Sequence, residues 1–131
     1  MEIPFRAALL DWLAADPALS DALNAIAEEA PSRTALPWLA ISASASIDWS
    51  TKDLAGREVR VAFELRTRGD TALADAALVA AIERRIESFP SDQSATGFRV
   101  ASLAFTRARA EQRGEATRAT LLEYRGRLLA A

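Results

Sequence analysis

The feature that most constrains this fold is a change of hydrophobic period near residue 38. Over residues 58–66, apolar side chains alternate with charged or small ones, and the apolar set is Val59, Val61, Phe63 and Leu65. Residues 38–48 alternate in the same way, and their predicted apolar face consists of Leu39, Ile41, Ala43, Ala45 and Ile47. A period of two is typical of a strand that buries one face. The two segments therefore predict a β-hairpin whose loop spans residues 50–56.

The segments on either side of this hairpin have the longer period that is typical of helices. Apolar residues follow an i, i+4, i+7, i+8 pattern at Phe5, Leu9, Trp12 and Leu13. Asp16 and Pro17 then predict the start of a second helix. Its buried stripe is predicted to be Leu19, Leu23 and Ile26, and we expect it to end before Pro31. A third helix is predicted over residues 70–89, with its cap at Gly69–Asp70.

The last third of the chain predicts two long strands, over residues 98–109 and 116–129, joined around Gly114. Phe98 and Val100 have one parity whereas Leu103 and Phe105 have the other, which predicts a β-bulge near Ala101. The predicted fold is α+β: a single domain over residues 1–131 with a mainly antiparallel four-stranded sheet and helices packed on one face. The other face of that sheet is expected to carry Glu58, Arg60, Glu64, Arg66, Arg125 and Arg127.

The composition argues against catalysis. The chain has no cysteine and no histidine, which excludes disulfides, thiolate chemistry and the commonest general base and metal ligand. Its five glycines stand apart, so no phosphate-binding loop is predicted. We therefore predict no catalytic, cofactor-binding or metal-binding residue. A small enzyme built on Lys52, Tyr124 and carboxylates is kept as a third hypothesis.

Arginine supplies 15 of the 16 basic residues, which raises the question of nucleic-acid binding. The net charge is −2, however, and the arginines alternate with glutamates along the predicted strands. The only local basic run is formed by Arg107, Arg109 and Arg113. Cross-strand ion pairs are the favoured interpretation, and an accessory nucleic-acid-binding domain that uses an Arg-rich sheet face is the alternative.

Charge is distributed unevenly along the chain. Residues 1–31 hold six acids and one arginine, a net charge of −5, whereas residues 97–131 hold seven arginines and three acids, a net charge of +4. This asymmetry suits head-to-tail contacts between identical subunits. We expect the loop after the first strand to be mobile and to contact a neighbour. The candidate interface residues are Trp49, Lys52, Asp53, Arg107, Arg109 and Arg113.

Four segments together carry a resemblance to a known family. They are "FRAALLDWLAADPALSDAL", "APSRTALPWLAIS", "AGREVRVAFELRTRGDTALADAALVAAIERRI" and "GFRVASLAFTRARAEQRGEATRATLLEYRGRLLA". The pattern resembles the phage tail-completion, or tail terminator, proteins, including the versions encoded by gene transfer agents.

The resemblance implies a structural subunit that catalyses nothing and needs no cofactor. It implies a ring of six copies that terminates the tail tube and joins it to the head connector. The implied partners are other copies of the chain, the tail tube protein and the head–tail connector protein, with DNA passing through the ring without sequence-specific contacts. The implied location is the tail of a virion or phage-like particle assembled in the bacterial cytoplasm. No apolar run has the length of a membrane span, so no membrane contact is expected.

Overall fold

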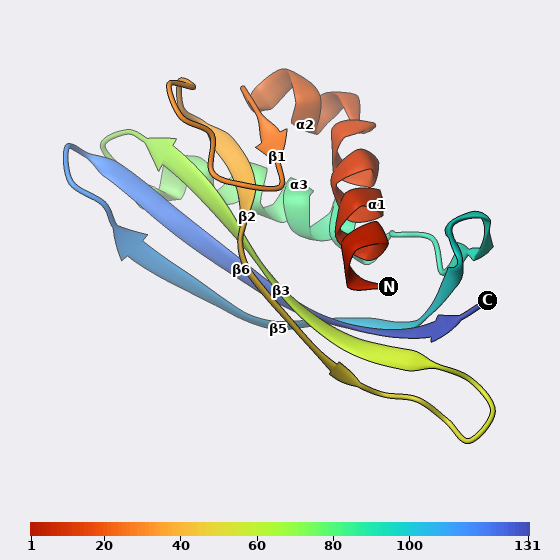
Figure 1. The fold of residues 1–131 in the computed structure, drawn as a ribbon. Helices are drawn as coiled ribbons and strands as arrows, with labels where there is room; N and C mark the ends of the chain where they lie inside the picture. The colour runs from red at the N-terminus through yellow and green to blue at the C-terminus, as the bar shows by residue number, and fades with distance from the viewer.

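The computed structural model describes all residues 1–131 and has an α+β fold. The helices are α1 (Glu2–Ala14), α2 (Pro17–Ala22) and α3 (Ala76–Glu87), with short 3-10 helices η1 (Ala72–Asp75) and η2 (Ser94–Thr96). The strands are β1 (Ile26–Ala27), β2 (Trp38–Asp48), β3 (Gly56–Arg68), β4 (Asp92–Gln93), β5 (Phe98–Gln112) and β6 (Thr117–Ala130). They form one sheet in the order β1-β2-β3-β6-β5-β4. Figure 1 shows a twisted sheet with the three helices on one face, while the other, which we call the open face, carries none.

The predicted fold class is confirmed, but the predicted number of strands is wrong. The sheet has six strands, because β1 pairs with β2 and β4 pairs with β5 at its two margins. Each of these extra strands is only two residues long. A two-residue strand is too short to show an alternating pattern, so the four long strands were the ones that periodicity could predict.

The second helix is much shorter than predicted. It has six residues, and Leu23 after it is extended at φ −107° and ψ 135°. Asn24 then donates its backbone N–H to the Pro37 carbonyl at 2.8 Å, which brings this segment beside the start of β2. As a result Ile26, which was expected on the helix, pairs in parallel with Leu39.

A β-bulge at Ser42 reverses the two faces in the second half of β2. Ile41 pairs with the inward-facing Phe63, and after the bulge Ser44 and Ser46 take the inward positions. The prediction that Ala43, Ala45 and Ile47 continue the buried face is therefore wrong, and Ile47 is 61% exposed. The inward serines meet polar groups of α1, where the Ser46 hydroxyl donates to the Glu2 carboxylate at 3.3 Å.

The β-bulge predicted near Ala101 is confirmed. The register between β5 and β6 shifts between Val100 and Ser102, which brings Leu103 onto the same face as Val100. A second shift between Phe105 and Arg107 was not predicted. Both strands extend slightly beyond their predicted ends, and they form a long hairpin.

The third helix begins differently from the prediction. The cap is Thr71, whose hydroxyl oxygen accepts the backbone N–H of Leu73, and the chain makes η1 before α3 starts at Ala76. The end of α3 is tied to α1 by two residues. The Trp12 indole N–H donates to the Arg85 carbonyl at 2.7 Å, and the Arg85 guanidinium lies 3.5 Å from the centre of the Trp12 ring.

Phe5 packs α1 against the sheet. Its ring is fully buried and lies edge-to-face with Phe89 and Phe98, at 6.1 Å between ring centres in each case. The Phe5 ring also contacts β6 at Gly126, where any side chain larger than hydrogen would collide with the ring. This cluster continues through the inward residues of β3, so the core lies between the helices and the sheet. None of the helices has the length and hydrophobicity that a membrane crossing needs.

Candidate interaction surface on the open face of the sheet

The open face of the sheet is covered by charged side chains. Glu58 lies directly opposite Arg127, and Arg60 lies opposite Arg125. The alternating pattern predicted that these four residues share this face. The charged residues that form ion pairs on this face are the arginines 60, 66, 107, 109, 113, 125 and 127 and the glutamates 58, 64, 111 and 123, and the strand register places Arg68 and Arg99 on the same face. Arginines outnumber acidic residues here, which leaves a surplus of positive charge. The predicted cross-strand ion pairing is confirmed, and the glutamates neutralise only part of the positive charge on this face.

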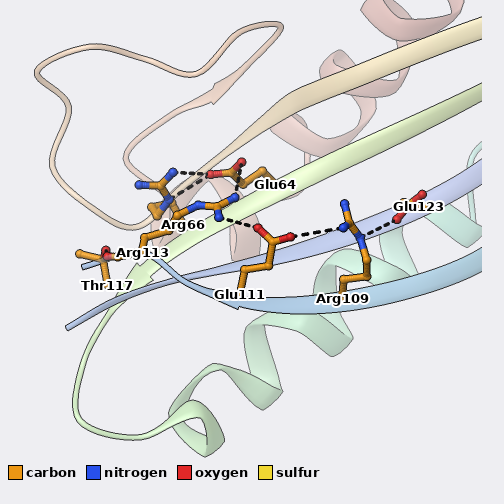
Figure 2. A network of polar contacts seen from close by, with 7 residues as sticks. All are labelled: Glu64, Arg66, Arg109, Glu111, Arg113, Thr117 and Glu123. Atoms are coloured by element: carbon orange, nitrogen blue, oxygen red, sulfur yellow. Dashed lines mark hydrogen bonds and ion pairs between the residues drawn. The ribbon is translucent and has the colours of Figure 1, made fainter. Parts of the chain in front are cut away.

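One continuous network of ion pairs runs across β3, β5 and β6 (Figure 2). Its members, in order of contact, are Arg66, Glu64, Arg113, Glu111, Arg109 and Glu123. The Glu64 carboxylate accepts from Arg66 at 2.7 Å and lies 3.8 Å from Arg113. Glu64 is only 9% exposed, because these guanidinium groups cover it. The network therefore holds the hairpin of β5 and β6 against β3 through side chains as well as through the backbone.

Glu123 lies at the end of this network between two arginines of β5. Its carboxylate accepts from Arg107 at 2.7 Å and from Arg109 at 3.3 Å. The hydrogen bond from Arg107, followed by the charges of both arginines, holds the pKa of Glu123 below its usual value despite some burial. Arg109 also reaches Glu111 at 3.3 Å. Because Arg107 and Arg109 share the single carboxylate of Glu123, this part of β5 keeps positive charge.

A second cluster surrounds Glu58 at the opposite end of the sheet. Arg127 lies 3.1 Å from its carboxylate, Arg125 lies 3.8 Å away and Arg60 lies 4.0 Å away. Glu58 is 7% exposed. The Arg127 guanidinium also lies over the Trp49 ring, 5.5 Å from its centre. Trp49 is thus a half-buried residue that stacks on an arginine of its own chain.

The structure separates the six predicted interface residues into two groups. Arg107, Arg109 and Arg113 belong to the network on β5. Trp49 and the exposed residues 52–53 belong to the loop between β2 and β3, which lies at the other end of the sheet from the β5–β6 turn (Figure 1). The fold does not bring these groups together within one subunit.

The loop between β2 and β3 is held by hydrogen bonds of its own. The Thr51 N–H donates to the Leu54 carbonyl at 2.8 Å, and the Gly56 N–H donates to the Ser50 hydroxyl at 3.0 Å. Leu54 is 41% exposed, so the loop presents an apolar side chain to solvent. Its mobility in the free subunit stays a prediction.

An apolar groove on the helix side of the sheet was not predicted. It has a volume of about 570 Å³ and lies between α3 with η1 and the outer parts of β5 and β6. Its apolar lining is Ala72, Ala76, Val79, Ala80, Ala110 and Ala119. Because these side chains are small, they do not fill the space between the helix and the strands. The ion pair of Arg118 with Asp75, at 3.1 Å, borders this groove. The run of alanines was the only sequence signal for it.

The two nearly buried glutamates were also missed. Glu58 and Glu64 were predicted only to lie on the face without helices, because strand alternation shows which face a residue takes and not how deeply it is buried. The available signal was the excess of arginine on the same face, since several guanidinium groups can cover one carboxylate. No group of three or more acidic side chains is arranged so that it could hold a metal ion.

Comparisons with known proteins agree with this architecture. The sequence matches the family described as tail completion protein gp17 over residues 7–128. The structure is similar to a chain in the solved virion of a native gene transfer agent particle, with a TM-score of 0.73, 21% sequence identity and coverage of 95% of this chain and 93% of that chain. At this identity the likeness shows the fold. A search of curated proteins gave no match.

Proposed function

Because this chain belongs to the tail completion protein gp17 family, structural proteins of phage-like tails, we propose that it forms a ring of identical subunits that terminates the tail tube. The protein is located in a virion or phage-like particle. The observation that carries the proposal is the family match, which extends over residues 7–128 and so includes all of β2, β3 and β5, nearly all of β6 and most of α1.

The proposed ring has six copies and joins the tube to the head connector. Its partners are then other copies of the chain, the tail tube protein and the head–tail connector protein, with DNA passing through the centre. A charged open face supports a role in which one surface meets other proteins or the passing DNA. The uneven charge supports contacts in which one patch meets a different patch on the neighbour, since such heterologous contacts close into rings.

The direct test is sedimentation velocity combined with negative-stain electron microscopy of the purified chain. We expect a closed ring at high protein concentration. Exposed ion pairs contribute only about 0–1 kcal/mol each, so salt should slow assembly more than it weakens the finished ring. A preparation that stays monomeric at every concentration and salt, also in the presence of the tail tube protein, would count against the ring.

A charge-reversal variant tests which arginines matter for assembly. Arg107→Glu/Arg109→Glu should weaken assembly, because it removes the positive charge that one shared carboxylate leaves on β5. Its melting temperature should change little, since both side chains are well exposed, at 61% and 44%. Arg84→Glu on the exposed side of α3 is the matched control. Equal assembly of the double variant and the wild type at all salt concentrations would remove these arginines from the interface.

The surplus of positive charge on the open face favours one alternative, an accessory domain that binds nucleic acid. Phosphate contacts make such binding fall steeply with salt. The interleaved glutamates oppose it, because they neutralise much of the face. Retention of labelled duplex DNA by monomeric protein, lost in proportion to added salt, would support this alternative over the ring.

A further inference from the structure

The outer edge of β2 is open and unprotected over most of its length. β1 pairs only with Leu39 and Ala40, so residues 42–48 have a hydrogen-bonded partner on the β3 side alone. Natural sheets usually protect such edges with lysine, proline, inward charges or a bulge. Between the bulge at Ser42 and Asp48 the edge has none of these, and its residues are alanine, serine and one isoleucine.

The other margin of the sheet is open as well. β4 pairs only with Phe98 and Arg99, which leaves residues 101–112 of β5 without a partner on their outer side. This strand has two bulges, and beyond the second of them residues 107–112 pair regularly with β6. The regular part carries Arg107, Arg109 and Glu111 on the open face and alanines on the helix face.

The directions of the strands make these two edges compatible. The order β2-β3-β6-β5 is antiparallel throughout, so β2 and β5 run in opposite directions within one subunit. A second copy placed beside the first in the same orientation therefore brings its β5 antiparallel to β2. The helices of both copies then lie on the same side of the joined sheet.

We propose that residues 43–47 of β2 pair with residues 107–111 of β5 in a second copy of this chain, with Ser44 opposite Ala110. This inference rests on the self-association proposed above and names its surface. Backbone hydrogen bonds between the two edges would supply the contact, as in other cases of strand addition. Because the two edges differ, the contact is heterologous and repeats around a ring.

Side-chain sizes and charges on the two edges are complementary. On the open face, the small Ala43 and Ala45 leave room for the long side chains of Arg107 and Arg109. On the helix face, serines of β2 meet alanines of β5, so neither face is crowded.

Acidic groups border the β2 edge. Arg6 binds Glu28 at 2.6 Å and also donates to the Ser44 hydroxyl at 3.4 Å, which places the acidic segment after β1 near this edge. Glu29 and Asp48 have no ion-pair partner there, whereas two arginines of β5 share Glu123. Acidic groups from the first part of the chain thus lie beside the β2 margin, and Arg107 and Arg109 lie at the β5 margin.

The absence of cysteine permits a direct test with single-cysteine variants and a short bismaleimide cross-linker. Ser44→Cys and Ala110→Cys are both exposed and both lie on the helix face of their strands. We expect a cross-linked dimer when the two variants are mixed and almost none when either is treated alone. Ala77→Cys, exposed on α3, replaces Ala110→Cys in the control mixture.

A pair of matched substitutions tests the same contact without a cross-linker. Ala45→Lys adds a positive charge facing the arginines of β5, and Ala45→Glu adds a negative charge at the same position. Like charges opposite each other across strands are destabilising, so Ala45→Lys should weaken self-association by roughly 1.4- to fivefold, while Ala45→Glu should not weaken it. Equal effects of both substitutions would overturn the proposed pairing.

The cross-linking result separates this proposal from the proposed ring. Rings without a cross-link above the control would overturn the β2–β5 contact and leave the ring standing. A cross-link without rings would support the contact and count against ring closure. Cross-linking of Ser44→Cys alone would indicate a two-fold contact between β2 edges and overturn the proposal. A lack of both rings and cross-links would overturn both.

Discussion

Replacing Gly126 with alanine tests the close packing of Phe5 in α1 against the sheet. A Cβ atom at this position would lie 2.8 Å from Cζ of Phe5 and 3.2 Å from its Cε2. Carbon atoms normally approach to about 3.5–4.0 Å. The Phe5 ring cannot move aside easily, because Phe89 and Phe98 lie against it at 6.1 Å between ring centres. The extra methyl group therefore has to displace the ring or the strand.

The expected loss of stability follows from two opposing effects. Overpacking a core costs about 1–3 kcal/mol. Replacing glycine within a strand returns about 0.5–1 kcal/mol, because alanine loses less backbone entropy on folding. The free energy of unfolding of Gly126→Ala should therefore fall by about 1 kcal/mol, as measured by urea denaturation followed by circular dichroism. For a domain of this size, the melting temperature should fall by roughly 2–8 °C.

Phe5→Leu provides the control, since leucine lacks the ring atoms that the new methyl group would strike. In this background Gly126→Ala should cost less than it does in the wild type, and the double-mutant cycle should show a favourable coupling between the two changes. A Gly126→Ala variant that equals the wild type in stability would refute the reasoning. Additive effects of the two substitutions would refute it equally, because they would show that the two residues do not compete for space.

Three further predictions concern the sheet. Tyr124→Phe should leave stability unchanged or raise it by up to about 1–3 kcal/mol, because the Tyr124 hydroxyl is buried without a hydrogen-bond partner; a clear loss in urea denaturation would mean that it has one. The lowered pKa of Glu123 makes its stabilising effect present above the ordinary value of 4.5 and lost as the pH falls through the folded value. Glu123→Gln should therefore have a lower free energy of unfolding than the wild type at neutral pH, and the two values should converge in acid. A difference in this free energy that stays constant across the pH range would contradict this. Phe63→Ala should cost about 3–5 kcal/mol, since Phe63 is fully buried, and an unchanged melting transition would contradict its place in the core.

The long elements could be predicted from the sequence because their patterns are local. The alternation in residues 58–66 needs no partner to be recognised, and neither does the helical spacing that starts at Phe5. The bulge at Ala101 was predictable for the same reason, since apolar residues with two parities in one strand require an extra residue between them. The charged open face followed from the same alternation.

Tertiary structure alone decided the features that depend on distant partners. The bulge at Ser42 could not be predicted from the sequence, because alanine and serine alternate in this part of β2 and neither residue strongly prefers the core. Ile26 is not helical because backbone groups at the start of β2, distant in the chain, are available to pair with this segment. Glu58 became buried because arginines from two strands converge on it. Local patterns record which face a side chain takes, whereas burial and pairing depend on which other groups the completed sheet brings within reach.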